Sequence, residues 1–379
     1  MKILFLDQSG KLGGAELSLL ELAKFYRDSC LVCLFADGLF KETLVKNQVP
    51  VRILSKRPIQ IYKDSNFWQS IKNIGQLAPL ILEVTQLSSD YDLIYANTQK
   101  AMVVGSIVSW LTGKPLIYHL HDILSVEHFS KANRQLAIFL ANHFAALIVA
   151  NSQATKTAFI KAGGRTELVE IVYNGFDLAQ YQHQVSLPQL KQKLKLKGDY
   201  IIGNFSRLSP WKGQHILIEA LTYCPEATAI LVGDALFGEY EYVKQLHLQV
   251  EKLKLGDRVR FLGFRTDIPQ LMSICDLIVH TSTAPEPFGR VIVEAMLCGK
   301  PIVATAAGGA TELIENGCTG WLTPPGDVLK LKETIDLVYQ QPKIAEKIAI
   351  AGRDDAIRRF NISDIEKQIN YLLCKVIDF

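Results

Sequence analysis

The stretch LIVHTSTAPEPFGRVIVEAMLCGKPIVAT (277–305) has the order strand, loop, helix, strand. LIVH (277–280) and PIVAT (301–305) are continuous apolar runs, which is the pattern of strands covered on both faces. Between them, RVIVEAMLCG (290–299) has the character of a helix, and the loop before it contains two prolines. A helix that connects two such strands joins them in parallel, so this stretch predicts a doubly wound α/β sheet.

The same alternation occurs along the whole chain. Further strand-like runs lie at 3–6, 31–35, 51–54, 93–95, 115–120, 146–150, 200–205, 229–233 and 259–263. Segments between them, such as 14–28 and 241–254, carry apolar residues at helical spacing. The stretch 174–199 is polar, contains a proline and has no strand-like run. We therefore expect two Rossmann-like domains, 1–180 and 181–360, with ligands at the carboxyl ends of the strands in a cleft between them, and a C-terminal helix in 361–379.

Composition excludes several classes of protein. The net charge of +3 and the absence of a basic stripe with aromatics argue against nucleic-acid binding. Seven scattered cysteines indicate reduced thiols and a cytosolic compartment, and Cys30 and Cys33 lie in an apolar run typical of a core. The N-terminus MKILFLDQSG has the character of a first strand rather than a signal peptide. The apolar segments 101–111 and 145–150 are shorter than the ~20 residues that cross a bilayer, so we expect a soluble or at most peripheral protein.

Glu286 and Glu294 flank a Phe-Gly pair, and their spacing suggests a site for a phosphorylated ligand. Pro287 disfavours helical geometry at Glu286, which places this glutamate in a loop, whereas Glu294 lies about a turn inside the helix. The two carboxylates therefore do not flank one bond as a glycosidase pair does. Gly289 lets an anion approach the free N–H groups of the first helical turn, and each carboxylate can accept hydrogen bonds from hydroxyl groups on either side of that anion.

Two other loops follow predicted strands and precede predicted helices. In QSGKLGGAE (8–16), Gly13 and Gly14 allow a ligand close to a helix N-terminus, although a simple tight turn explains them equally well. The loop is not GxGxxG, and the chain contains no GxxxxGK[ST] motif. In NFSRLSPWKGQHILIEAL (204–221), Arg207 and Lys212 bracket a turn, and two cations above a helix N-terminus suit a diphosphate. A solvated loop is the alternative for this pair.

YHLHDIL (118–124) ends a strand with His119 and His121 on the same side of the pleat. His121 is a candidate to hydrogen-bond or polarise a substrate group, with a capping or packing role as the alternative. His128 lacks an obvious metal-ligand spacing to the pair. The DxD sequence at 90–92 precedes its strand rather than following it, so we do not assign it to a metal–nucleotide site.

Taken in order, these segments resemble glycosyltransferase family 4, a family of retaining, nucleotide-sugar-dependent enzymes with the GT-B fold, and in particular its bacterial and cyanobacterial exopolysaccharide enzymes. The matching segments are GGAE (13–16), HD (121–122), NGFD (174–177), SRLSPWKG (206–213), LVGD (231–234), FLGF (261–264), EPFGRVIVEA (286–295), KPIVATAAGG (300–309) and GWLTPPGD (320–327). The match is strongest in the second half. Two departures are Arg290, where the family more often has an apolar or small residue, and the loop TSTAP (281–285).

The resemblance implies a role for each site residue. Arg207 and Lys212 would bind the donor diphosphate and neutralise the leaving group. Glu286 would contact the donor sugar, Glu294 would hold the ribose, and His121 would face the donor sugar and the acceptor. The remaining implied donor contacts are Gly13 and Gly14 near the phosphates, the loop at Phe264 and Arg265 against the base, and the backbone amides of Phe288, Gly289 and Val291.

The resemblance further implies a donor such as a UDP- or GDP-sugar, a saccharide or lipid-linked acceptor, and no metal or other cofactor. The acceptor would bind on the side of the N-terminal domain, and the C-terminal helix would pack back on that domain. The basic residues Lys56, Arg57, Lys63, Lys131 and Arg134 are candidates for a membrane or lipid-diphosphate contact, with solvated surface as the alternative.

Two other functions remain open at this stage. A GT-B nucleotide-sugar epimerase would interconvert UDP-sugars without an acceptor, and a non-catalytic binding protein would hold the donor without turnover. The charged site residues of the transferase pattern are all present, which favours the transferase, and the missing glycine fingerprint disfavours a Rossmann dehydrogenase.

Overall fold

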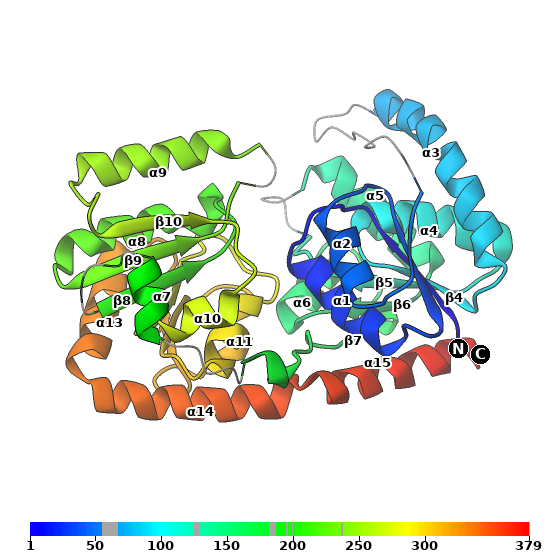
Figure 1. The fold of residues 1–379 in the computed structure, drawn as a ribbon. Helices are drawn as coiled ribbons and strands as arrows, with labels where there is room; N and C mark the ends of the chain where they lie inside the picture. The colour runs from blue at the N-terminus through cyan, green and yellow to red at the C-terminus, as the bar shows by residue number, and fades with distance from the viewer. Residues whose placement is uncertain are drawn as a thin grey trace. The chain divides into compact units, whose positions relative to one another are not determined.

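The chain forms two compact units, Met1–Phe176 with Ile362–Phe379, and Asp177–Asn361 (Figure 1). The computed structural model describes residues 1–54, 67–124, 129–181, 187–194, 196, 198, 200–235 and 238–378. The candidate membrane-contact residues Lys56, Arg57 and Lys63 lie outside the described residues, as does His128. The boundaries between the units fall at 176/177 and 361/362, where the sequence suggested 180/181 and 360/361.

The first unit is built on a seven-stranded parallel sheet of order β3-β2-β1-β4-β5-β6-β7. Its strands are β1 (Ile3–Asp7), β2 (Cys30–Leu34), β3 (Val51–Ile53), β4 (Leu93–Ala96), β5 (Leu116–Leu120), β6 (Ala145–Ala150) and β7 (Val169–Ile171). Its helices are α1 (Gly14–Phe25), α2 (Leu39–Lys46), α3 (Phe67–Ser88), α4 (Gln99–Thr112), α5 (Lys131–Phe144), α6 (Gln153–Lys161), the 3-10 turn η1 (Thr166–Leu168) and α15 (Ile362–Ile377).

The second unit carries a six-stranded parallel sheet of order β10-β9-β8-β11-β12-β13. Its strands are β8 (Tyr200–Phe205), β9 (Ala227–Val232), β10 (Val259–Gly263), β11 (Leu277–His280), β12 (Ile302–Thr305) and β13 (Trp321–Thr323). Its helical elements are η2 (Leu178–Tyr181), α7 (Leu187–Lys193), η3 (Pro210–Lys212), α8 (Gln214–Ala220), η4 (Leu221–Tyr223), α9 (Tyr240–Lys252), α10 (Ile268–Ser273), α11 (Arg290–Leu297), α12 (Ala310–Leu313), α13 (Val328–Gln340) and α14 (Pro342–Phe360).

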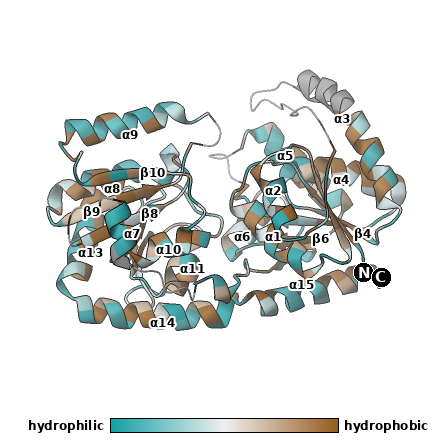
Figure 2. Cartoon of the chain, in the orientation of Figure 1, coloured by the Kyte–Doolittle hydropathy of each residue, from teal (hydrophilic) through white to brown (hydrophobic). Residues whose placement is uncertain are grey.

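Burial on both faces explains why the strands are continuous apolar runs. Every residue of β1, β4, β5, β9, β11 and β12 is buried. Helices α9 and α14 instead alternate hydrophilic and hydrophobic residues, as the teal and brown bands in Figure 2 show. The predicted parallel α/β architecture is therefore confirmed in both halves of the chain.

The last helix, α15, packs against the first unit although it follows the second one in sequence. Its apolar side chains Ile365, Ile369 and Leu373 belong to the same buried cluster as Ile3 and Leu19. The hydroxyl of Tyr26, the C-cap residue of α1, donates to Asn370 Oδ1 at 2.9 Å. The side chains of α15 thus complete the core of the first unit.

The strand order explains why the candidate site residues lie near the switch points of the two sheets. In both units the order reverses beside the first strand, between β1 and β4 and between β8 and β11, which are the switch points where ligands bind in open α/β sheets. Among the described residues, no helix is both long enough and apolar enough to cross a membrane.

Candidate functional site

Glu286 occupies the loop between β11 and α11, and Glu294 lies inside α11, as their sequence context predicted. The helix begins after Gly289, whose φ of +100° is the left-handed conformation that glycine adopts without steric cost. Glu286 also pairs with Gly308 in an isolated parallel bridge, and the N–H of Gly309 donates to the carbonyl oxygen of Glu286 at 2.7 Å. The backbone of Glu286 is therefore fixed before any ligand binds.

The carboxylate of Glu286 is buried among three donor side chains. Lys212 Nζ donates to Oε1 at 2.9 Å and to Oε2 at 2.7 Å. Ser282 Oγ donates to Oε2 at 3.0 Å, and His280 Nε2 lies 3.1 Å from the same oxygen. Burial alone would raise the pKa of Glu286, but the Lys212 ammonium and the bonds with His280 outweigh it and hold that pKa well below its usual range.

The two oxygens of this carboxylate differ in how many further hydrogen bonds they can accept. Oε2 has hydrogen-bond contacts with three side chains, Lys212, Ser282 and His280. Oε1 accepts a hydrogen bond from Lys212. A carboxylate accepts about four hydrogen bonds in total. Oε1 is therefore the oxygen better suited to accept a bond from a ligand hydroxyl.

The loop after β8 brings Lys212 to Glu286 because it is anchored to the loop after β11. Thr281 Oγ1 donates to the carbonyl oxygen of Lys212 at 2.9 Å, and the N–H of Thr283 donates to that of Trp211 at 2.7 Å. Gly213 has a φ of +68°, and a Cβ there would lie 2.0 Å from the carbonyl oxygen of Thr281. The glycine is thus required both by the turn and by the close contact.

Arg207 lies on the same loop and pairs with Glu239, an acid that no sequence motif marks. Its Nε is 3.2 Å from Glu239 Oε2, and Ser209 Oγ donates to Glu239 Oε1 at 2.5 Å. Trp211 lies beside both cations, with Lys212 Nζ 4.1 Å from its ring centroid and the Arg207 guanidinium carbon 6.0 Å from it. The loop thus holds two cations, each paired with a carboxylate, around one aromatic ring.

Glu294 is paired with the unusual residue Arg290. Arg290 Nε lies 3.7 Å from Glu294 Oε1, and both side chains are largely buried. Burial raises the pKa of Glu294, and Arg290 opposes that shift. A ribose at Glu294 would therefore bind beside a guanidinium.

The other candidate donor contacts of this unit differ in exposure. Phe288 is buried, with its ring edge-on to Phe360 at 5.8 Å, so its side chain belongs to the core and its backbone alone is available for binding. Phe264 is exposed, and Arg265 donates to Asp267 through Nε at 2.8 Å and Nη2 at 2.6 Å. Val291 is the second residue of α11, in its first turn.

In the first unit, the glycine loop is capped by its own helix. Gly13 is the N-cap of α1, and its N–H donates to Glu16 Oε2 at 3.0 Å, while Gly14 begins the helix. This capping box satisfies one of the donors that the sequence suggested for a ligand. An anion that uses the Gly13 N–H must displace the Glu16 carboxylate.

His121 lies just beyond the end of β5, next to other polar residues of the switch point. Its Nε2 is 2.9 Å from Asn97 Oδ1, and its ring stacks on that of His119 with centroids 3.8 Å apart, which agrees with the common side expected from the pleat. His121, Gly13 and Gly14 belong to the first unit, and Arg207, Lys212, Glu286 and Glu294 to the second.

Three further residues contact the candidate site residues without having been predicted from the sequence: His280, Ser282 and Glu239. His280 is the last residue of β11 and Ser282 follows two positions later, so a polar residue at a strand's carboxyl end was the available signal for both. Glu239 lies at the N-cap of α9, far from the cations in sequence, and no motif marks it.

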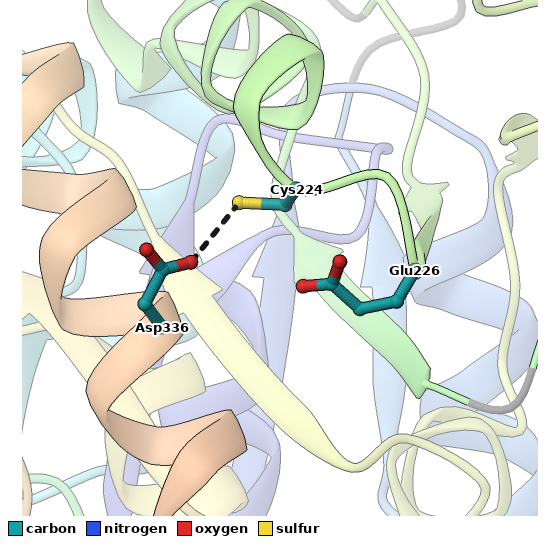
Figure 3. A group of neighbouring side chains, drawn as sticks. All are labelled: Cys224, Glu226 and Asp336. Atoms are coloured by element: carbon teal, nitrogen blue, oxygen red, sulfur yellow. Dashed lines mark hydrogen bonds between the residues drawn. The ribbon is translucent and has the colours of Figure 1, made fainter.

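A cluster of Cys224, Glu226 and Asp336 has metal-like spacing but unsuitable chemistry (Figure 3). Burial and the neighbouring acids raise the pKa of Cys224 to about 12, whereas metals bind the thiolate. Cys224 Sγ lies 3.9 Å from Asp336 Oδ1, and Lys332 Nζ lies 2.6 Å from the other oxygen of that carboxylate. Because the thiol and the carboxylate already have partners in the protein, we assign no metal to this cluster.

Comparison with known proteins identifies the family. Residues 12–180 match the family model "Glycosyltransferase Family 4", and residues 187–355 match "Glycosyl transferases group 1". The crystal structure of HepE from Anabaena in complex with UDP-glucose is 55% identical in sequence, with a TM-score of 0.93, and the match covers 99% of this chain and 100% of that chain.

Two curated relatives are more distant. Spore coat protein SA of Bacillus subtilis is 31% identical over 217 residues, 53% of this chain and 56% of that protein. The chain thus spans about half of that relative's length. The UDP-Gal:alpha-D-GlcNAc-diphosphoundecaprenol alpha-1,3-galactosyltransferase of Escherichia coli is 24% identical over 85% of this chain and 88% of that protein.

The expected fold and enzyme class are confirmed by these likenesses. The two family models match adjoining halves of the chain, and HepE matches it almost from end to end. On these grounds the chain belongs to the group 1, family 4 glycosyltransferases, which have the GT-B fold.

Proposed function

We propose that this glycosyltransferase moves glucose from UDP-glucose to a saccharide or lipid-linked acceptor, with retention of the anomeric configuration and without a metal ion. The observation that carries the choice of donor is the 55% identity, over almost the whole chain, with HepE, whose structure contains UDP-glucose. The arrangement of cations and carboxylates after β8 and β11 supports the same donor class.

The proposed chemistry begins with the two cations. Arg207 and Lys212 bind the diphosphate of the donor and stabilise the negative charge that develops on it as the glycosidic bond breaks. Both ammonium and guanidinium groups are already held in place by carboxylates, by Glu286 at 2.7 Å and by Glu239 at 3.2 Å. Because two fixed cations can supply this stabilisation, the proposal requires no metal.

The carboxylates bind the two ends of the donor. Glu286 Oε1 accepts a hydrogen bond from a hydroxyl of the sugar, while Oε2 stays bonded to Ser282 and His280. Glu294 accepts bonds from the ribose, with Arg290 beside it. The exposed loop at Phe264 and Arg265 contacts the base.

In this proposal the anomeric configuration is retained because the acceptor hydroxyl attacks the anomeric carbon from the same face of the sugar that the diphosphate leaves. An oxygen of the leaving diphosphate takes the proton of the acceptor hydroxyl, so no enzyme nucleophile is needed. For His121 we propose the role that the family resemblance implies, a contact with the sugar or the acceptor. We place the reaction in polysaccharide or glycolipid synthesis in the cytoplasm. The exposed Lys131 and the half-buried Arg134 are the described residues that we propose for contact with the membrane surface.

The donor preference can be tested with a panel of nucleotide sugars. A ligand that binds only the native state stabilises it by about 2.7 kcal/mol when its concentration is 100 times its Kd. At equal donor concentration, the rise in Tm therefore ranks the donors by affinity. UDP-glucose is expected to raise Tm more than UDP-galactose or GDP-mannose, and turnover is expected to survive chelation with EDTA. A larger shift with a GDP-sugar, or loss of turnover in EDTA that added Mg²⁺ restores, would contradict the corresponding part of the proposal.

A further inference from the structure

A chain of hydrogen-bonded side chains connects two strand ends at the switch point of the second unit. Asn204 is the fifth residue of β8, and Thr281 directly follows the neighbouring strand β11. Both side chains are buried, as is that of Gln214, the first residue of α8. Polar side chains buried in this way must satisfy one another, so their hydrogen bonds have definite directions.

Asn204 is at the centre of this chain. Its Nδ2 donates to the carbonyl oxygen of Val279 at 2.9 Å and to Thr281 Oγ1 at 3.1 Å. Because a carbonyl oxygen only accepts, the amide cannot be turned around, and its Oδ1 accepts from Ser206 Oγ at 3.2 Å. Thr281 Oγ1 therefore receives a hydrogen from Asn204 and donates its own to the carbonyl oxygen of Lys212 at 2.9 Å.

Gln214 forms the other end of the chain. Its Nε2 donates to Ser206 Oγ at 2.7 Å and to the carbonyl oxygen of Arg207 at 2.9 Å. The carbonyl oxygen again fixes the orientation of the amide. The Ser206 hydroxyl, which receives a hydrogen from Gln214, donates its own to Asn204. Each hydroxyl of the chain thus accepts one hydrogen bond and donates one, an arrangement in which neighbouring bonds strengthen each other.

The two ends of this chain hold the main chain at the two cations of the loop. One end is hydrogen-bonded to the carbonyl oxygen of Lys212 and the other to that of Arg207. Fixed charges stabilise a reacting group best when they do not have to reorganise, which requires a rigid main chain beneath them.

We propose that Asn204 is a positioning residue which, through this chain, holds the main chain at both cations in the geometry that binds a diphosphate. Thr281 carries the effect to Lys212. Gln214 carries it to Arg207 by way of its own amide. The diphosphate as ligand rests on the proposed function, whereas the chain of hydrogen bonds does not.

The two ends can be changed while the centre stays in place. Asn204→Leu would also remove the donor to the carbonyl oxygen of Val279, so its effects on folding and on binding would be mixed. Thr281→Val keeps the shape of the side chain and removes its hydroxyl, and Gln214→Met keeps the length and removes the amide. Thr281→Ser keeps the hydroxyl and is therefore the rescue variant.

Thr334→Val is the matched control. Thr334 is also buried in the second unit, and its Oγ1 donates to the carbonyl oxygen of Lys330 at 2.9 Å within α13. The substitution therefore removes a buried threonine hydroxyl from a helix rather than from the loop that carries the cations.

The affinities for UDP and for uridine separate positioning of the cations from a general loss of structure. UDP carries the diphosphate and uridine does not, so displaced cations weaken the binding of UDP alone. Titrations followed by ligand-detected NMR give both Kd values. In Thr281→Val and in Gln214→Met we expect the Kd of UDP to rise about tenfold and that of uridine to change by less than about twofold. Thr281→Ser and Thr334→Val are expected to match the wild type for both ligands.

Lys212→Met tests whether Thr281 acts through Lys212. Alone it is expected to weaken UDP binding, and adding Thr281→Val to it is expected to change the Kd of UDP by less than about twofold. An undiminished effect in the double variant, unchanged UDP affinity in Thr281→Val, or an equal loss for uridine overturns the positioning of Lys212.

Unchanged UDP affinity in Gln214→Met, or an equal loss for uridine, overturns the positioning of Arg207. If Lys212→Met itself leaves UDP affinity unchanged, the diphosphate contact in the proposed function is wrong and the positioning role is overturned with it. A loss in Lys212→Met without one in Thr281→Val overturns the positioning role alone.

Discussion

At the scale of single residues, the pairing of Lys212 with Glu286 decides the electrostatics of the second unit. Both side chains are largely buried, with 14% and 10% exposed, and their charged atoms are 2.7 Å apart. Removing one partner of such a pair leaves an uncompensated buried charge, which costs about 3–5 kcal/mol. The pair must therefore be tested for stability and activity separately.

Lys212→Met is expected to invert the contribution of Glu286 to the pH dependence of folding stability. In the wild type, the low pKa of Glu286 stabilises the fold above the unfolded pKa of about 4.3, and this stabilisation is lost as the pH falls toward the lower folded pKa. In the variant, burial dominates and raises the pKa of Glu286. Its Tm should therefore rise relative to wild type as the pH falls from 7 to 5.

The control is Lys244→Met, because Lys244 pairs with Glu241 at 3.3 Å while its side chain is 71% exposed. Melting curves of the three proteins across this pH range make the comparison. A Lys212→Met curve parallel to that of wild type would show that Lys212 does not set the ionisation of Glu286.

Glu286→Gln keeps the shape of the side chain and removes its charge. We expect turnover to fall roughly 100-fold or more, because the amide presents an NH₂ group to Lys212 or to the ligand in place of one carboxylate oxygen. Steady-state UDP release measures this, with Glu241→Gln on the surface of α9 as the control. Equal turnover in the two variants would show that the charge of Glu286 has no role in the reaction.

At the scale of elements, Gly308, which follows β12, positions the loop that carries Glu286. Gly308 has a φ of +62°, and a Cβ there would lie 2.2 Å from the carbonyl oxygen of Glu286. Gly326 has a φ of +76° and open space around its Cβ position. Substituting alanine at Gly326 therefore measures the cost of the left-handed backbone alone, and substituting it at Gly308 adds the cost of the close contact.

Gly326→Ala is expected to cost about 1 kcal/mol, the penalty of left-handed backbone alone. Gly308→Ala is expected to cost more than this and to raise KM for the donor, because the loop at Glu286 has to move. Urea unfolding and donor kinetics of both variants provide the measurement. Similar stability and similar KM in the two would mean that the loop accommodates the methyl group freely.

The elements also show how far the sequence could be interpreted. Continuous apolar runs predicted the strands that are buried on both faces, such as β8 and β11. The three-residue edge strands β7 and β13 were not anticipated, because an isolated Val-Glu-Ile or Trp-Leu-Thr has no pattern to distinguish it from a loop. Short runs of this kind become strands only through pairing with a neighbour.

For the candidate site, local spacing was sufficient to place Glu286 in a loop and Glu294 in a helix. It was not sufficient to find that His280, Ser282 and Glu239 contact the candidate residues, since those contacts depend on loops brought together by the sheet. The glycines at 13 and 14 were expected to expose donors, but the structure shows that Glu16 caps the Gly13 N–H. Such side-chain competition for a donor is a property of the folded loop.

At the scale of the whole molecule, the C-terminal helix α15 makes the first unit depend on the last residues of the chain. Leu373 is 0% exposed and packs in the cluster that includes Ile3 and Leu19. Leu373→Ala is expected to destabilise the first unit by about 2–5 kcal/mol, with little effect on the second. Hydrogen exchange resolved by peptide measures both units in one sample.

Tyr371→Ala provides the control, because Tyr371 is on the same helix and its side chain is 59% exposed. Faster exchange in β1 and α1 is expected in Leu373→Ala alone. An equal loss of protection in β8 and β11 would show that α15 supports both units rather than the first one.

The UDP-glucose site that we propose is built around Lys212 and Glu286. The most direct test is the rate of UDP release from UDP-glucose, with and without sugar acceptors, in the wild type, Lys212→Ala, Glu286→Gln and Lys244→Met. We expect turnover in the wild type and in Lys244→Met, and a loss of roughly 100-fold or more in the other two variants while circular dichroism shows both folded. Near-normal UDP release in folded Lys212→Ala and Glu286→Gln would contradict it.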